Sequence, residues 1–169
     1  MFAVAIIVGI YSYSVFVLGL LGLLKPFPVF ILSLICLFFS ILYFKKTIKS
    51  LKIKFLFKPK LLVFSLLFTS IAIVNLIGAL GPELSFDALW YHLTIPKFFI
   101  ESNSVHFIPG GLFYYSVMPK LIDMLYVPGL MFGAELVPKL ISLGFGIMTC
   151  VAIYKLSRKE KQKKSFKEY

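Results

Sequence analysis

Residues 61–101 of this chain read LLVFSLLFTSIAIVNLIGAL followed by GPELSFDALWYHLTIPKFFIE. The first half, residues 61–80, carries no charged side chain, and its most polar member is Asn75. An uncharged apolar helix of this length can cross the roughly 30 Å of hydrocarbon in a bilayer. Gly81 and Pro82 then end the helix, because proline has no backbone N–H and cannot continue it. The stretch therefore predicts a membrane-spanning helix that ends in a polar, aromatic-rich loop.

The composition places the whole chain in the same class. Hydrophobic residues make up 60% of the sequence, charged residues 15%, and the mean hydropathy is +0.95. A soluble domain of 169 residues cannot bury this much apolar surface, so much of that surface must face lipid. The sequence therefore predicts an integral membrane protein and excludes a soluble globular domain.

Three other apolar segments complete the predicted bundle, at residues 1–24, 27–44 and 135–154. The first lacks the basic start of a cleaved signal peptide, so we expect it to be retained as a span. Residues 119–133 are also apolar, but Lys120, Asp123 and Pro128 interrupt them. A fifth crossing here would also place the basic residues 155–169 on the opposite side of the membrane from the basic residues 45–60. On a helical wheel Lys120 and Asp123 lie opposite the apolar face, which predicts a helix in the membrane interface.

Basic residues gather in the linker 45–60 and in the tail 155–169, each beside a predicted span. The positive-inside rule places both in the cytoplasm and residues 81–134 outside it. The net charge of +11 therefore fits basic clusters that bind anionic lipid headgroups beside the spans, and we expect no nucleic-acid partner. We expect a terminal helix pair at 1–44, a core at 61–154 and a disordered tail at 155–169. The fold class is all-α, with about four transmembrane helices and two interfacial helices in one extracytoplasmic loop.

The loop holds the candidate chemistry. We expect residues 81–96 to form a short helix capped by Ser85, with Asp87 among aromatic side chains on one face. A carboxylate at the mouth of a membrane bundle could deprotonate a sugar hydroxyl, or it could simply complement the helix dipole. At 3.6 residues per turn His92 lies about 140° from Asp87, so the two cannot share a ligand without a bend. A metal site formed by His92 and His106 is disfavoured, and the spacing selects no metal ligands.

The sequence Asp87-Ala-Leu-Trp-Tyr-His92-Leu-Thr-Ile-Pro-Lys97, followed by an aromatic-rich turn and Tyr115-Ser116, resembles a known pattern. It is similar to the first extracytoplasmic loop of bacterial GT-C glycosyltransferases. These enzymes are related to the protein mannosyltransferases and the aminoarabinose transferase, and they use polyprenyl-phosphate-linked sugars. Residues 61–154 follow the family's order of span, loop with interfacial helices, and span.

The resemblance implies that Asp87 is the loop's essential acid, either as general base toward the acceptor or in positioning the donor. It offers Tyr91, His92 and Lys97 as substrate-binding residues and leaves the cofactor, including a divalent metal, open. The only arginine is Arg158 in the tail, so the loop has no bidentate phosphate clamp.

We therefore expect part of a glycosyltransferase of the bacterial inner membrane, truncated or split, with both termini cytoplasmic. Its partners would be a lipid-linked sugar donor, membrane lipids and a second chain that completes the site. The alternative is a small non-enzymatic four-span partner or scaffold protein. That protein would bind its partner through the aromatic loop. Gly129 and Gly133, or Gly144 and Gly146, could allow helices to approach each other closely.

Overall fold

The computed structural model describes residues 2–48, 59–118 and 120–165. Throughout these ranges the regular structure is helical, without strands. The six α-helices, the π-helix η1 and the 3-10 helix η2 have these bounds: α1 Phe2–Leu20, α2 Pro26–Ile48, α3 Pro59–Leu80, η1 Ala88–His92, α4 Thr94–Ser102, η2 Gly111–Val117, α5 Leu121–Met131 and α6 Leu136–Ser165.

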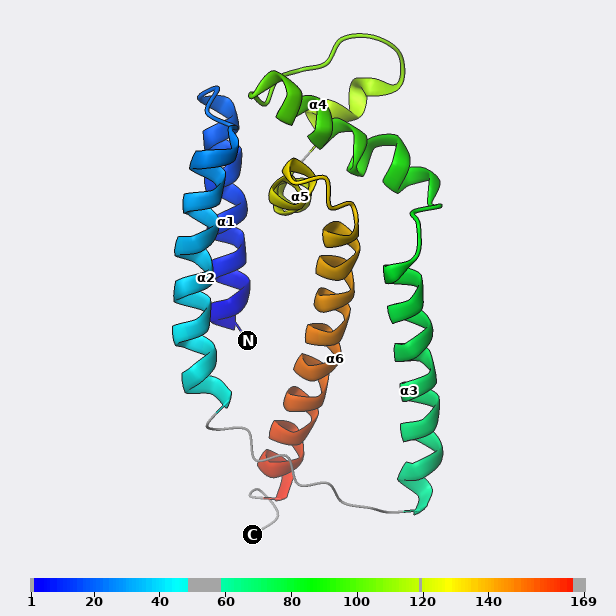
Figure 1. Ribbon diagram of the computed structural model, residues 1–169. Coiled ribbons are helices and arrows are strands. Elements are labelled where there is room, and N and C mark those ends of the chain that lie inside the picture. Colours follow the sequence, from blue (N-terminus) through cyan, green and yellow to red (C-terminus); the bar gives the residue numbers. More distant parts are fainter. Residues whose placement is uncertain (1, 49–58, 119, 166–169) are drawn as a thin grey trace.

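Four of these helices, α1, α2, α3 and α6, are long and apolar enough to cross a membrane. They run roughly side by side in Figure 1, with α4 and α5 at one end of the bundle and the start of α1 and the end of α6 toward the other. The predicted class, an all-α polytopic membrane protein, is confirmed.

The structure differs from the sequence prediction at the end of the chain. Helix α6 continues to Ser165, so residues 155–165 are helical where we expected a disordered tail. Lysine, arginine, glutamate and glutamine are good helix formers, and adding residues to an existing helix avoids the cost of nucleation. The predicted linker 45–60 falls largely outside the described residues, which resume at Pro59.

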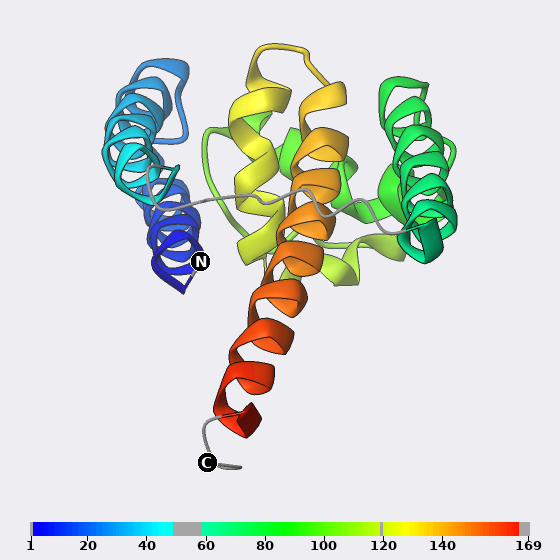
Figure 2. The ribbon, with the colours of Figure 1, turned by 90° about the horizontal axis from the view of Figure 1, so that it is seen from below.

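Helix α5 is the centre of the packing. It contacts α1, α2, α4 and α6 and lies across the direction of the long helices. Figure 2, viewed from below, shows the α1–α2 pair and α3 on opposite sides of α6. The fully buried core joins α4 and α5 through Ile95, Phe99, Met124 and Val127. By contrast, Ala79 is the one buried residue within the α3 span, so the long helices leave most of their apolar surface for lipid.

Two glycines allow the close contacts that tie this core to the spans. The Val105 backbone N–H donates to the Gly19 carbonyl at 2.9 Å, and a Cβ on Gly19 would overlap the Val105 side chain. A Cβ on Gly129 would lie 2.5 Å from Cβ of Val137, where α5 meets α6. The predicted close approach at Gly129 is therefore present, whereas a Cβ on Gly144 would meet nothing within 4 Å.

Candidate functional site

A cavity of about 1440 Å³ lies between α3 and α6 and extends to the start of the loop. Along the helices its walls are mainly apolar, with residues such as Phe68, Ile73 and Leu143. At the loop end the lining changes to ionisable and hydroxyl-bearing side chains. These are Glu83, Ser85, Asp87, His92, Tyr126, Lys139 and Ser142. The cavity is thus amphipathic along its length, with its ionisable groups gathered at one end and only the uncharged Ser65, Thr69 and Asn75 as polar residues along α3.

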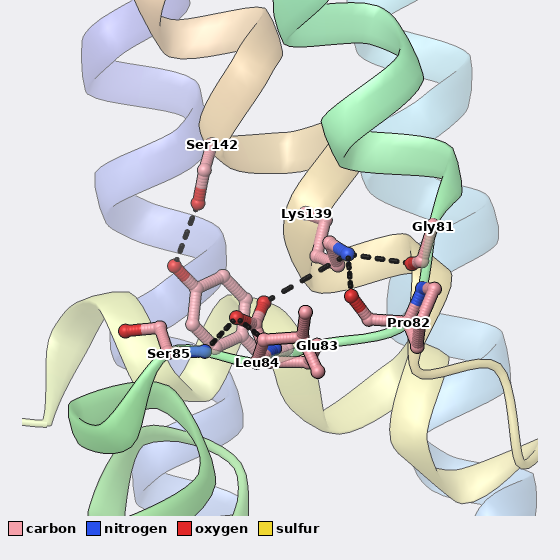
Figure 3. A network of polar contacts seen from close by, with 8 residues as sticks. Gly81, Pro82, Glu83, Leu84, Ser85, Lys139 and Ser142 are labelled. Carbon is pink, nitrogen blue, oxygen red and sulfur yellow. Dashed lines mark hydrogen bonds and ion pairs between the residues drawn. The ribbon is translucent and has the colours of Figure 1, made fainter.

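Lys139 organises the polar end of the cavity (Figure 3). Its Nζ donates to the Gly81 carbonyl at 2.6 Å and to the Pro82 carbonyl at 3.1 Å, and lies 4.0 Å from Oε2 of Glu83. Carbonyls at the end of a helix lack intrahelical partners and favour a cation. Lys139 therefore ties the end of α3 to α6, and its donors are largely used in doing so.

The loop begins with a different cap from the predicted one. Oε1 of Glu83 accepts the backbone N–H groups of Leu84 at 3.0 Å and Ser85 at 2.8 Å. The Ser85 backbone carbonyl accepts the N–H of Leu89, so the helical turn does start near Ser85. The Glu83 carboxylate thus binds the two N–H groups that precede the helical turn, and not the later N–H groups that a Ser85 cap would bind. No role was predicted for Glu83, and its position just after Pro82 was the only signal.

A π turn follows and changes the relation between Asp87 and His92. The Leu93 N–H donates to the Ala88 carbonyl at 2.9 Å, five residues back, and η1 covers Ala88–His92. In such a turn, positions five apart come round to nearly the same side. Pro96 supplies the reason, because in a regular α-helix its ring would clash with the carbonyl of His92. The predicted 140° separation is therefore wrong, and both side chains line the same cavity.

Asp87 lies exposed at the cavity mouth. It makes no side-chain capping hydrogen bond, and the described part of the chain provides no ion pair to its carboxylate. The carboxylate is therefore available to a ligand.

His92 belongs to a buried polar network that the sequence did not predict. Its Nδ1 lies 2.7 Å from Oδ1 of Asp123, and Nζ of Lys120 lies 3.3 Å from Oδ2 of the same carboxylate. The side chains of Asp123 and Lys120 are 1% and 4% exposed, while that of His92 is 38% exposed. Asp123 on α5, and Lys120 just before this helix, therefore point into the protein. The prediction that these two side chains face water on an interfacial helix is wrong. Their i,i+3 spacing in an apolar run was the available signal.

Aromatic rings form a ladder beside this network. Tyr114 stacks on Tyr115 with ring centroids 4.2 Å apart, and Tyr115 stacks on Tyr91 at 4.6 Å. Trp90 meets Tyr115 edge-on at 5.6 Å and contacts Phe86 at 4.5 Å. The hydrogen bond with Tyr114 is the main cause that raises the pKa of Tyr115 above its ordinary value of 10.0. Tyr115 therefore stays neutral at physiological pH.

The other predicted site residues occupy different positions. Tyr91 is part of the ladder, with its ring centroid 4.2 Å from that of His92. Lys97 pairs with Glu135, and neither residue lines the cavity. His106 bonds to Ser104 and packs on Phe99, so the structure does not bring it to His92. Within the described residues no three His, Cys, Asp or Glu side chains are grouped to hold a metal ion.

The fold defines the chain as an all-α membrane protein with four candidate spans and a polar site at one end of the α3–α6 cavity. Comparison with protein-family models, with curated proteins and with solved structures gives no match.

Proposed function

We propose that this chain forms the acidic part of a membrane glycosyltransferase site that takes its sugar from a polyprenyl-phosphate donor. The observation that carries the proposal is the amphipathic α3–α6 cavity, with apolar walls along the helices and Asp87 at its polar end. A lipid-linked sugar has the same division, since its prenyl chain is apolar and its phosphosugar head is polar. Burial of the chain would contribute about 0.8 kcal/mol for each CH2 removed from water.

Asp87 is the residue that we place in contact with the reacting groups. Its exposed carboxylate can accept the proton of an acceptor hydroxyl or hold the donor head, and both roles stay open at this point. The exposed end of the aromatic ladder, at Tyr114, offers a flat apolar surface to a sugar ring.

The donor phosphate requires cations that this site does not offer. Lys139 is occupied by two carbonyls and Glu83, Lys120 is buried against Asp123, and Lys97 pairs with Glu135. A bidentate arginine clamp is the usual solution, and the loop contains no arginine. The proposal therefore includes a second chain that contributes the phosphate-binding residues.

The proposal also assigns the sides of the membrane. Lysines next to α2 and α3, and the basic end of α6, favour the cytoplasm, so the loop would lie outside a bacterial plasma membrane. The acceptor would then be an extracytoplasmic hydroxyl compound.

The direct test is sugar transfer from a radiolabelled polyprenyl-phosphate sugar in membranes that contain this chain and its complementing chain. Asp87→Asn removes the charge at constant shape, and we expect transfer to fall by about 10²–10⁴-fold. Glu101→Gln is the matched control, because Glu101 is an exposed carboxylate of α4 that does not line the cavity. Equal transfer by the Asp87→Asn variant and the control would refute the role of Asp87.

The second candidate function is a non-enzymatic partner protein, and the exposure of α3 favours it. Within the α3 span Ala79 alone is buried, which leaves the side of α3 that faces away from α6 for another membrane protein. Co-purification of a larger membrane protein, without sugar transfer in any combination of chains, would support this function over the first.

A further inference from the structure

The imidazole ring of His92 has one nitrogen, Nδ1, in contact with the protein, and a second, Nε2, without a partner in the described structure. Nδ1 is engaged by the buried Asp123 carboxylate, while the ring is 38% exposed and lines the α3–α6 cavity. Among the described residues Nε2 has no hydrogen-bond partner. The nitrogen on the open edge is thus the one available to a molecule in the cavity.

The surroundings of Asp123 determine which nitrogen carries the proton. Nζ of Lys120, itself nearly fully buried, lies 3.3 Å from Oδ2 and forms an ion pair with the Asp123 carboxylate. An ionised carboxylate only accepts hydrogen bonds, so the 2.7 Å contact requires a proton on Nδ1 of His92. Neutral imidazole has one N–H, and Nε2 is therefore the unprotonated nitrogen.

We propose that Nε2 of His92 is the proton acceptor for the hydroxyl group that attacks the donor sugar, with Asp123 as its positioning residue. This inference rests on the proposed function and settles the role that was left open for Asp87. The acceptor hydroxyl gives its proton to Nε2, and its oxygen forms the new bond to the anomeric carbon. The bond from that carbon to the phosphate oxygen breaks, and the phosphate leaves with the electron pair. Asp123 stabilises the imidazolium that forms, and Asp87 positions the donor head.

The groups around His92 are consistent with this role. Its own turn contributes Tyr91, whose ring also lies 6.0 Å from Nζ of Lys120. The cavity side contributes Glu83, Asp87 and Lys139 at the loop end, and α5 contributes Tyr126, whose hydroxyl bonds to Ser142 at 3.0 Å. In the described structure the carboxylate of Asp123 is the charged group within hydrogen-bond distance of the imidazole.

The chain contains two histidines, so His106→Gln leaves His92 as a single imidazole for ¹⁵N NMR. We expect the full-length His106→Gln protein in lipid nanodiscs to show a protonated Nδ1 and an unprotonated Nε2. Asp123→Asn in the same background should shift the population toward the Nε2–H tautomer. A protonated Nε2 in the His106→Gln protein overturns the proposal, and this holds even if the Asp123→Asn variant fails to fold.

Sugar transfer provides the second readout. His92→Gln should lower transfer by about 10²–10⁴-fold, while His106→Gln leaves it unchanged. Normal transfer by His92→Gln overturns the proton-acceptor role and leaves the proposed function intact. If the unaltered chain transfers no sugar with any complementing chain, the proposed function fails and the proton-acceptor role in transfer is overturned with it. The nitrogen shifts would then still show whether Asp123 orients His92.

Discussion

Removal of one partner from the Lys120–Asp123 pair should destabilise the protein strongly. Asp123→Ala leaves the Lys120 ammonium, 4% exposed, without its counter-charge and leaves Nδ1 of His92 without its acceptor. Loss of one member of a buried ion pair costs about 3–5 kcal/mol, because the remaining charge stays desolvated. We expect this loss in the free energy of unfolding, measured by reversible denaturation in mixed micelles.

The Lys97–Glu135 pair is the internal control. Its side chains are 45% and 52% exposed, so Glu135→Ala should cost only about 0.2–1 kcal/mol. The double variant Lys120→Met with Asp123→Leu removes both buried charges, and its stability should equal or exceed that of the original protein by up to about 4 kcal/mol. A cost of Asp123→Ala as small as that of Glu135→Ala would refute the burial of this pair.

Two further predictions test the packing and the topology. Gly129→Leu should destabilise the protein by about 1–3 kcal/mol through overlap with Val137. Gly144→Ala, in open space within α6, should be neutral or should stabilise the protein by up to about 1 kcal/mol. The free energy of unfolding of both variants, measured in the same micelles, distinguishes them, and equal losses would contradict the α5–α6 contact. Reporter fusions after residue 60 and after Ser104 should lie on opposite sides of the membrane, because α3 separates them, and reporters on the same side would rule out α3 as a span.

The sequence predicted the spanning helices well because lipid is a strong and simple constraint. A backbone inside hydrocarbon must satisfy its own hydrogen bonds, so long apolar runs bounded by prolines and lysines become helices. Residues 61–80 and 27–44 needed no knowledge of their neighbours for this prediction. The tail was misjudged because its charged residues were interpreted as a sign of disorder, whereas their helix propensity extends α6 to Ser165.

The site was harder to predict because it depends on contacts between distant segments. A helical wheel places Lys120 and Asp123 on one face, but it does not say whether that face meets water or another helix. The Asp123 side chain contacts that of His92, which lies 31 residues earlier in the chain, and this contact buries the face. The π turn η1 was not predicted, because Pro96 disfavours a regular α-helical turn before it but does not show whether the helix ends there or widens into a π turn.

The position of a lipid-linked donor in the α3–α6 cavity is the central claim, and photolabelling tests it directly. A polyprenyl phosphate with a photoreactive group on its prenyl chain would be irradiated with the protein in nanodiscs, and labelled peptides identified by mass spectrometry. We expect label on cavity-lining residues such as Ile73 and Leu143, in excess over Leu37, which is exposed on α2 outside the cavity. Excess unlabelled polyprenyl phosphate should remove this label. Equal labelling of α2, α3 and α6, unaffected by the competitor, would contradict the claim.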